Sequence, residues 1–600
     1  MEPTKVVKRA LYLGRKMFKE IPEREKLLVL SLLVGICSGL AAVLLQSLVH
    51  FIQHTLTAHT DSRIGSLLYL VLPGVGMLIS LIFIKYFIKD NVGHGVTKVL
   101  LAVSRNESRI RPHNMYSSVL ASSVTIGFGG SVGAEAPIVY TGAAIGSNFA
   151  RYAGMSYRNV TVLLGCGAAA AVAGIFKAPL AGVLFTLEIL LFNISMTSMM
   201  PLLLSAVSAT MVASIILGHD HPFECTLTEF SMVNIPFYII LGLVCGLCAL
   251  YFLRTTMWME DKIAHSRRNT YFKWLSCAIG LGLLIWLFPP LYGEGYGVLS
   301  VLLNGGELNL DRSSILSFLL HSPWGLVLFF LLILLLKVFS MTLTNAGGGV
   351  GGTFGPTLFI GGIAGFVVSR SLNLILASSP LVVPEQNFVL VGMAGLMAGV
   401  MQAPMTAIFL IAEISGGYEL YIPLIVTAAI SFGTTRLFEK YSIYTKRIAQ
   451  SGDLITHDND QSALTMMNIK DLVRDKYPRV HLDDTLGKLA EIYAESTASV
   501  IAVVDDEGIF QGLVNVDIKK IRNMLFQSDL YDSIHVYNIM EMPPAVVSVD
   551  EKMDSVMMKF DKTEAWRLPV LDSSRKYIGF VSKSRILVAY REEIRELSQD

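Results

Sequence analysis

One carboxylate stands out in the stretch from Gly130 to Tyr140, which reads Gly-Ser-Val-Gly-Ala-Glu-Ala-Pro-Ile-Val-Tyr. Glu135 lies there among small residues, and Pro137 suits the first turn of the apolar helix that we expect to follow. The free N–H groups of a helix's first turn and the helix dipole favour anions. The Glu135 carboxylate is therefore placed to occupy an anion site and to leave it when protonated. The alternative is an ordinary helix cap.

Two further side chains could donate a hydrogen bond to an anion. Gly93 and Gly95 bracket His94 in a short polar loop, which suits a donor that points into a pathway. The alternative is a solvated loop histidine. Tyr444 follows the last apolar run and could supply a phenolic donor at one mouth of the pathway. The alternative for Tyr444 is an interfacial tyrosine.

Two halves of the chain carry the same pattern of Gly, Pro and Glu. Gly133-Ala-Glu-Ala-Pro137 corresponds to Gly352-Thr-Phe-Gly-Pro356 in the second half, each ahead of an apolar helix. Further on, Ala-Pro is followed nine residues after the proline by Glu-Ile in both halves, at 178–189 and 403–414. Corresponding interrupted segments in two halves point to a transporter-type site at the repeat interface, where the glycine-rich turns face each other.

The composition is that of a polytopic membrane protein. Of the 600 residues, 53% are hydrophobic and 16% are charged, and the mean hydropathy is +0.56. This is too apolar for a soluble chain of this length. In such a chain an intramembrane carboxylate is by default a functional-site hypothesis. The net charge of +1 gives no indication of nucleic-acid binding.

The basic residues orient the chain. Eight Lys and Arg residues precede Leu27, which predicts a cytoplasmic N-terminus by the positive-inside rule. We expect residues 1–26 to form a cytosolic amphipathic helix. The first apolar run is too long for a signal peptide and has no small-residue cleavage site behind it.

The expected membrane domain covers residues 27–449 and has two repeats, at about 27–217 and 233–445. Its apolar segments between Met115 and Leu217 are short and interrupted by Gly and Pro. This pattern predicts discontinuous helices whose ends meet inside the membrane. After a polar linker at 450–466 the composition becomes soluble, and a tandem α/β repeat is expected at the two ranges 467–527 and 535–598.

No metal site is predicted. The spacing Cys245-Gly-Leu-Cys248 would suit metal or redox chemistry in a cytosolic protein, but it lies within an apolar helix and has no second pair. The loop from His219 to Cys225 contains His, Asp and Glu, and nothing in the sequence fixes their geometry.

Four motifs, in the order in which they follow one another along the chain, resemble those of the CLC family of chloride channels and chloride/proton exchangers. With the C-terminal domains, the resemblance is to family members of the bacterial type. Gly130–Pro137 is similar to the gate-glutamate motif of the family and Gly352–Pro356 to its Gly-x-Phe-x-Pro motif. Gly93–Thr97 is similar to the first anion-site loop, and Ser442–Thr445 to the segment with the central tyrosine. The C-terminal repeat resembles the tandem CBS domains that often follow such membrane domains.

The resemblance implies a membrane domain built as an inverted repeat of discontinuous helices. It also implies a homodimer in the plasma (inner) membrane, surrounded by lipid, with one pore in each subunit and both termini cytoplasmic. Glu135 would be the external gate and, in an exchanger, the proton carrier. The resemblance places a chloride or another small anion at these residues: His94, Gly95, Gly133, Ala134, Gly352, Thr353, Phe354 and Tyr444.

The chain departs from the family pattern at several positions. His94 replaces a serine that contributes to anion choice, Ala134 replaces a basic residue, and Ala136 replaces a glycine. Ile189 stands where many exchangers have the glutamate linked to internal proton transfer. That substitution is common in channels, although some exchangers lack the glutamate and still couple. His94, Glu413 or a water wire could substitute for it.

CBS pairs often bind adenine nucleotides through a hydroxyl and an acid near the second strand. Ser582 supplies the hydroxyl in the second module, but Arg585 stands where the acid is expected. In the first module Asn515 replaces the hydroxyl and Ile518 the acid. An adenine nucleotide is therefore a possible ligand but no cofactor is required, and a purely structural, dimerising role is the alternative.

Several functions fit these features to different degrees. The first hypothesis is a transporter that exchanges chloride for protons through Glu135, and its rival is a passive chloride channel gated by the same residue. A CBS-regulated cation transporter would need carboxylates along its path, whereas the sequence offers amide-rich glycine turns. A membrane-anchored nucleotide sensor would not need interrupted, repeated helices. An enzyme is not expected, because no nucleophile–base arrangement or phosphate loop is present.

Overall fold

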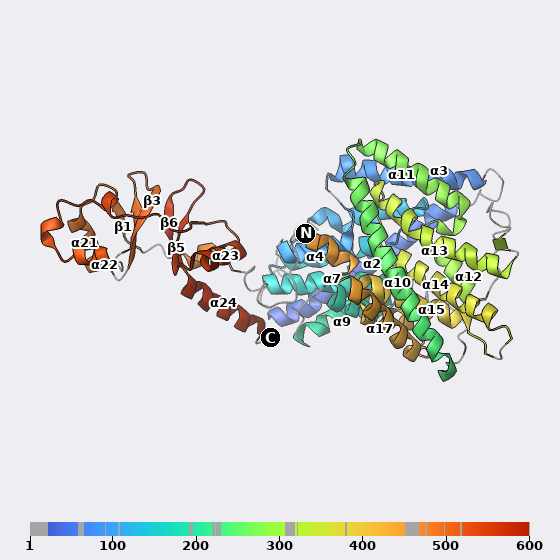
Figure 1. The fold of residues 1–600 in the computed structure, drawn as a ribbon. Helices are drawn as coiled ribbons and strands as arrows, with labels where there is room; N and C mark the ends of the chain where they lie inside the picture. Colours follow the sequence, from blue (N-terminus) through green and yellow to red (C-terminus); the bar gives the residue numbers. More distant parts are fainter. Residues whose placement is uncertain are drawn as a thin grey trace, which may run out of the picture. The chain divides into compact units, whose positions relative to one another are not determined.

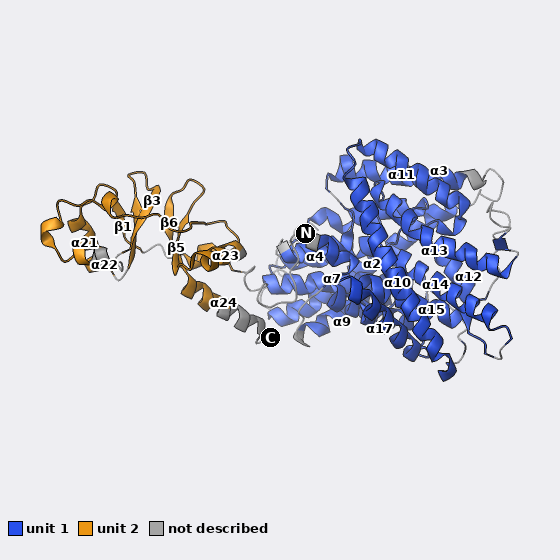
Figure 2. Ribbon diagram, viewed as in Figure 1, with its two compact units in different colours: residues 1–454 blue, residues 455–600 orange. Residues whose placement is uncertain are grey.

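The structure is a computed structural model that divides the chain into two compact units, residues 1–454 and 455–600, coloured blue and orange in Figure 2. Each unit is considered by itself. The described residues are 22–57, 65–90, 92–105, 108–190, 196–218, 223, 228, 230–305, 319–320, 322–378, 381–450, 467–473, 477–496, 499–515 and 519–598.

The first half of unit 1 is helical (Figure 1). Its helices are α2 (Glu23–Thr57), α3 (Gly65–Ile82), the π-helical turn η1 (Phe83–Ile88), α4 (Gly95–Arg105), the 3-10 turn η2 (Pro112–Met115), α5 (Ser117–Gly127), α6 (Glu135–Tyr152), α7 (Tyr157–Phe176), α8 (Pro179–Ile189) and α9 (Met196–Leu217).

The second half repeats this organisation. Its helices are η3 (Met232–Asn234), α10 (Ile235–Ala264), α11 (Thr270–Leu287), η4 (Pro289–Leu291), α12 (Tyr296–Leu303), α13 (Pro323–Ala346), α14 (Phe354–Ile375), α15 (Glu385–Met401), α16 (Pro404–Ile414), α17 (Tyr421–Phe438) and α18 (Ile443–Gln450).

Nine helices in the described part of the chain are long and apolar enough to cross a membrane. Among the shorter apolar helices are α4, α5, α8 and α16, which have 11 residues each. At a rise of about 1.5 Å per residue such helices span only part of a bilayer. Large apolar side chains face outward, as in Leu44, Ile215 and Ile279, which are 51%, 75% and 62% exposed. The predicted fold class, with discontinuous apolar helices, is confirmed.

Glycines bring the helices of each repeat into direct backbone contact. A Cβ atom added to Gly142 of α6 would clash with the carbonyl oxygen of Gly167 in α7, and one on Gly167 would clash with that of Gly142. Gly361 of α14 and Gly392 of α15 meet in the same way. Only residues without a side chain allow two helix backbones to approach this closely. The α6–α7 and α14–α15 pairs are therefore tightly packed equivalents.

Two segment boundaries differ from those expected from the sequence. The boundary predicted at residue 26 falls inside α2, because the helix-forming residues Glu23 to Lys26 run into the apolar stretch without a break. Residues 1–21 of the predicted amphipathic helix and residues 451–466 of the predicted linker lie outside the described residues. Similarly, α10 continues to Ala264, beyond the end of the apolar run, because its charged residues find partners: Arg254 pairs with Glu439.

Unit 2 contains two modules of the same topology. In the first, β1 (Arg479–His481) lies parallel to β2 (Val500–Val504), and β3 (Phe510–Asn515) is antiparallel to β2. In the second, β4 (Val547–Ser548), β5 (Arg567–Leu571) and β6 (Tyr577–Ser582) repeat this order. The helices are α20 (Ile469–Leu472), α21 (Leu486–Glu495), α22 (Lys519–Met524), α23 (Met553–Thr563) and α24 (Lys583–Ser598), with the 3-10 turns η6 (Ser528–Leu530) and η7 (Val536–Asn538).

The two modules exchange their leading segments. Ile469 and Leu472 of α20, at the start of the first predicted module, lie in the apolar core of the second module. Val536 of η7, at the start of the second, lies in the core of the first. Phe510 and Tyr577 meet in a separate apolar cluster that joins the sheets. The modules therefore form one folding unit, and the predicted boundaries 467–527 and 535–598 do not separate two independent cores.

Candidate functional site

The two glycine-rich turns face each other and are hydrogen-bonded. The N–H of Gly133 donates to the carbonyl oxygen of Gly352 at 3.0 Å, and the N–H of Gly352 donates to that of Gly133 at 2.6 Å. This reciprocal bridge brings the N-termini of α6 and α14 together. The Gly-x-x-x-Pro motif that is repeated in the sequence thus contributes to one site from both halves of the chain.

Glu135 is the first residue of α6, and its carboxylate is bound by the other half of the chain. Oε2 accepts a hydrogen bond from the N–H of Gly355 at 3.1 Å, and Oε1 accepts one from the Tyr296 hydroxyl at 2.5 Å. The side chain is only 2% exposed. A Cβ atom on Gly133 would overlap the Glu135 carboxylate, so this position needs glycine. The carboxylate thus accepts a backbone N–H at the start of α14 as well as the N–H of Glu135 itself at the start of α6.

A second carboxylate lies at the N-terminus of α6. Glu294 Oε1 accepts a hydrogen bond from the N–H of Ala134 at 2.9 Å. The Lys337 ammonium of α13, which is fully buried, donates to the carbonyl oxygen of Gly293 at 2.8 Å. Sequence reasoning missed these residues, although signals were present: glycines bracket Glu294 as they bracket His94, and Lys337 is a single cation in an apolar helix.

Two buried hydroxyls near Glu135 have no hydrogen-bond partner in good geometry in the described structure. They are Thr353 Oγ1, just before α14, and the Tyr444 hydroxyl of α18. The two hydroxyls lie close enough to interact with each other, although not in good hydrogen-bond geometry, and Glu135 acts electrostatically on Tyr444. Buried polar groups are normally satisfied, so two unpartnered donors beside a helix N-terminus suit an anionic ligand. Phe354 is also buried and packs against Phe176 with ring centroids 5.4 Å apart.

His94 points toward an ion pair instead. Its backbone is left-handed, with φ of 55°, and Nε2 lies 4.0 Å from Glu260 Oε1. Arg447 of α18, three residues after Tyr444, binds both oxygens of Glu260 at 3.1 and 2.6 Å. Gly95 begins α4, and a Cβ atom there would clash with the carbonyl oxygen of Ala136 in α6. The loop thus packs against α6 through Gly95 and sends the His94 imidazole toward Glu260.

The repeated glutamates Glu188 and Glu413 form reciprocal helix caps. Glu188 of α8 accepts hydrogen bonds from the N–H groups of Met405 and Thr406 at the start of α16, at 3.1 and 2.8 Å. Glu413 of α16 accepts from the N–H groups of Leu180 and Ala181 at the start of α8, at 3.1 and 2.9 Å. Ile189, next to Glu188, is buried. The carboxylate of Glu413, one alternative for internal proton transfer, is thus held by two backbone amides.

The candidate nucleotide residues of unit 2 lie at equivalent strand ends. Asn515 ends β3 opposite Val500, and Ser582 ends β6 opposite Arg567. The Ser582 hydroxyl accepts a hydrogen bond from the N–H of Arg585 at 3.3 Å in the first turn of α24. Ile518 lies outside the described residues. Asn515 and Ser582 therefore occupy equivalent positions in the two modules, as the tandem repeat in the sequence predicts. In this structure the Ser582 hydroxyl caps α24.

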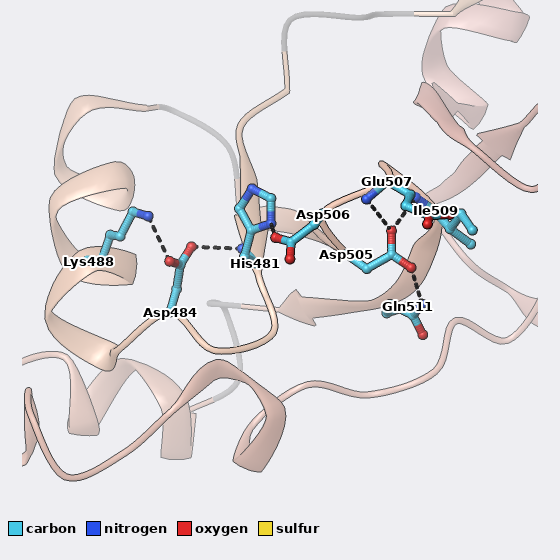
Figure 3. A network of polar contacts seen from close by, with 8 residues as sticks. All are labelled: His481, Asp484, Lys488, Asp505, Asp506, Glu507, Ile509 and Gln511. Atoms are coloured by element: carbon cyan, nitrogen blue, oxygen red, sulfur yellow. Dashed lines mark hydrogen bonds and ion pairs between the residues drawn. The ribbon is translucent and has the colours of Figure 1, made fainter.

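The first module also contains a network of aspartates on turn amides (Figure 3). Asp484 accepts hydrogen bonds from the N–H of His481 and the ammonium of Lys488, both at 2.7 Å. Burial alone would raise the pKa of Asp484, but these donors hold it below its usual value. The Ile509 N–H and the Gln511 amide likewise lower the pKa of Asp505. No group of His, Cys, Asp or Glu in the described ranges could hold a metal ion.

Comparison with known proteins assigns the family. The family model described as voltage gated chloride channel matches residues 75–436, which is more than half of the chain. The chain belongs to the voltage-gated chloride channel family. A CBS domain model matches residues 536–592, within the second module of unit 2.

Relatives in this family include channels and exchangers by name. Chloride channel protein CLC-e of Arabidopsis thaliana is 29% identical over 69% of this chain and 60% of its own length. The H(+)/Cl(-) exchange transporter ClcA of Vibrio cholerae is 29% identical over 67% of this chain and 84% of its own. The chain thus spans less than two thirds of the plant relative.

Solved structures of the voltage-gated chloride channel family share the fold. A slow cyanobacterial Cl−/H+ antiporter aligns with a TM-score of 0.61 and 23% identity, over 72% of this chain and 98% of that one. A eukaryotic CLC transporter aligns with a TM-score of 0.59 and 18% identity, over 96% and 98% of the two chains. The chain is a multi-pass membrane protein of this fold.

Proposed function

We propose that the chain is a secondary active transporter that exchanges chloride, or another small anion, for protons, with Glu135 as external gate and proton carrier. The observation that carries the proposal is the position of the Glu135 carboxylate, which accepts the Gly355 N–H at the start of α14. The names of the Vibrio cholerae exchanger and of the cyanobacterial antiporter support the same activity.

The geometry supports a competition between the carboxylate and the anion. An ionised Glu135 carboxylate satisfies the Gly355 N–H and keeps an anion out. A proton removes its charge and with it about half of the attraction of the donors, because hydrogen bonds to charged groups are about twice as strong as neutral ones. An anion then takes its place between the Gly355 N–H and the hydroxyls of Thr353 and Tyr444. Each exchange of carboxylate for anion thus requires one proton on Glu135.

The second candidate function is a passive chloride channel gated by the same residue. The observation that favours it is Ile189, a buried apolar residue that cannot carry a proton. A cation transporter is less well supported, because the groups around the gate are N–H and hydroxyl donors. The proposal is a transport function and not an enzymatic one.

The experiment that tests the proposal measures flux in liposomes that contain the purified protein. A chloride gradient is applied with and without an opposing pH gradient, and the reversal potential is determined. If chloride drives protons uphill, the protein is an exchanger. If the reversal potential equals the chloride equilibrium potential at every pH gradient, the protein is a channel and exchange is excluded.

Assembly and location form a further part of the proposal. We propose a homodimer in the plasma (inner) membrane with both termini in the cytoplasm. Exposed apolar side chains on α8, α9, α16 and α17 support a lipid- or subunit-covered face; examples are Leu180, Met211, Met405 and Ile422, which are 40%, 58%, 49% and 44% exposed. The Lys and Arg residues before Leu27 support a cytoplasmic N-terminus. Cross-linking in native membranes tests the dimer.

We also propose that unit 2 binds an adenine nucleotide near Ser582 and Asn515 as a regulator, and that transport requires no cofactor. Their equivalent positions at the ends of β6 and β3 support this idea. Calorimetric titration of the full chain in detergent with ATP, ADP and AMP tests it. Ser582→Ala should weaken binding about tenfold, and the absence of any binding heat with all three nucleotides would exclude the ligand.

A further inference from the structure

The segment from Gly293 to Tyr296, here called the latch segment, touches the gate twice. The Tyr296 hydroxyl donates to the Glu135 carboxylate at 2.5 Å. Glu294 accepts the N–H of Ala134, the residue just before the gate, at 2.9 Å. One short segment thus holds the gate side chain and the backbone from which that side chain swings.

The latch segment is itself firmly held. Lys337 donates to the Gly293 carbonyl oxygen, and the Gly293 N–H donates to the carbonyl oxygen of Gly129 at 3.2 Å. Gly295 has a φ of 91°, and the ring of Phe359 fills the space where a Cβ atom would lie. The Tyr296 ring packs edge-on against Phe223 with centroids 5.5 Å apart. The phenol therefore meets Glu135 from a fixed position.

Two acids, a phenol and a cation form one electrostatic group at the gate. Glu135 acts electrostatically on Glu294, both carboxylates act on Tyr296, and Glu294 and Lys337 act on one another. Glu135 also acts on Tyr444 of α18. Position 134, directly before the gate, is an uncharged alanine. Lys337, a buried cation, interacts with the latch segment through the Gly293 carbonyl oxygen and Glu294.

We propose that Tyr296 and Glu294 are positioning residues of the gate: the Tyr296 hydroxyl latches the ionised Glu135 carboxylate in its closed position, and the Glu294 carboxylate sets the pH at which the latch releases. The inference rests on the proposed role of Glu135 as a protonatable gate. It assigns two further functional residues, neither of which belongs to the motifs that bind the anion.

The two residues act on the gate with opposite sign. A hydroxyl that donates to a carboxylate stabilises its ionised form, whereas a neighbouring carboxylate destabilises it. Tyr296→Phe removes the donor, so the gate takes up its proton at higher pH. Glu294→Gln keeps an oxygen for the Ala134 N–H and removes the negative charge, so the gate takes up its proton at lower pH.

The experiment measures chloride flux in liposomes at equal pH on both sides, between pH 4 and 9, for each variant. The midpoint of the pH profile should move up by about one pH unit in Tyr296→Phe and down by about one pH unit in Glu294→Gln. Glu188→Gln is the matched control, because Glu188 is also a half-buried acid on backbone amides but does not contact the gate. Its midpoint should remain that of the unaltered protein.

The results distinguish a failure of the latch from a failure of the proposed role of Glu135. Shifts of the two midpoints in the same direction, or no shift beyond that of the Glu188 control, would overturn the latch. In Glu135→Gln the pH profile should be flat, and adding Glu294→Gln or Tyr296→Phe should leave it flat. A persisting pH profile in Glu135→Gln would instead overturn the proposed function. If a variant does not fold, Tyr296→Trp and Glu294→Asp provide the second comparison, with the same signs at smaller size.

Discussion

The two halves of the chain meet at two helix pairs, α8 with α16 and α6 with α14. At both, a carboxylate accepts backbone N–H groups at the start of a helix, but the two arrangements differ. At the crossing of α8 and α16, each helix ends in a glutamate that caps the start of the other, so Glu188 and Glu413 satisfy both helices symmetrically. At the crossing of α6 and α14, Glu135 caps α14, but Phe354 stands at the equivalent position of the second half. The start of α6 is served by Glu294, from outside the repeated motif.

The difference explains how one crossing can move while the other stays closed. In the symmetric crossing, the loss of either carboxylate leaves two backbone donors without their acceptor, which is costly within a membrane. At the asymmetric crossing, Glu294 accepts the Ala134 N–H of α6 independently of Glu135, so under the proposed mechanism an anion can replace Glu135 at α14. The broken symmetry is therefore what the proposed gate requires.

The largest effect is expected from Glu135→Gln. The amide resembles the protonated gate and cannot ionise, so we expect complete loss of proton coupling and of the pH dependence of chloride flux. Proton uptake and chloride flux are measured together in liposomes that contain the variant. Glu188→Gln is the comparison at the symmetric crossing, and unaltered pH dependence in Glu135→Gln would contradict the gating assignment.

The second prediction concerns the space that the gate needs. In Gly133→Ala the new methyl group overlaps the Glu135 carboxylate and approaches the Gly355 nitrogen. Overpacking of about 1–3 kcal/mol should lower chloride flux about tenfold or more. The control is Gly297→Ala in α12, where a Cβ atom meets no atom within 4 Å. Equal flux in the two variants would show that the gate does not require the bare glycine.

At the symmetric crossing we expect a loss of stability instead of a change in gating. Glu188→Ala leaves the N–H groups of Met405 and Thr406 without their acceptor, so unfolding should become easier by about 1–3 kcal/mol. Thermal unfolding in detergent measures this effect, and the exposed Glu419→Ala serves as control. A melting temperature that falls no further than in the control would show that the caps contribute little.

The smallest effect is expected where a carboxylate binds backbone amides in contact with water. The pKa of Asp484 is lowered in the folded state, so its stabilisation is present above the ordinary value of about 3.9 and is lost as the pH falls through the folded value. Asp484→Asn should destabilise the first module by about 1 kcal/mol or less at pH 7. The difference from the unaltered chain should shrink as the pH falls through the lowered pKa of Asp484 in the folded state.

Hydrogen exchange of the β1–β3 region in the full-length protein measures this last effect. Asp529→Asn, at an exposed position of η6, is the control. A difference between Asp484→Asn and the unaltered protein that stays constant from pH 3 to pH 7 would exclude an ionised Asp484 as its source.

The meeting of the two glycine-rich turns, with Glu135 between them, could be predicted because repetition and glycine spacing can be seen in the sequence itself. The pairing of the turns at Gly133 and Gly352 follows from the repeated Gly-x-x-x-Pro spacing. The partners of the gate do not, because Glu294 and Tyr296 lie in a segment without a repeated counterpart. Whether an isolated acid in an apolar chain meets a solvent path, a lysine or a helix end depends on tertiary packing.

The same limit applies to the orientation of single side chains. The sequence places His94 in the anion loop, but its left-handed backbone turns the imidazole toward Glu260. The exchange of α20 and η7 between the two modules of unit 2 was also beyond local patterns. Short apolar segments such as Ile469 to Leu472 could be buried in the core of either module by their sequence. The structure places Ile469 and Leu472 in the core of the second module.

The glycine contacts of α6 with α7 and of α14 with α15 also determine how the protein should respond to its lipid environment. Helices in backbone contact cannot slide or tilt without losing that contact, so the perimeter that faces the acyl chains stays constant while Glu135 rotates. A transporter that rocks whole domains changes this perimeter in every cycle and is sensitive to hydrophobic mismatch. We therefore expect turnover to be nearly equal in bilayers of short-chain and long-chain phosphatidylcholine.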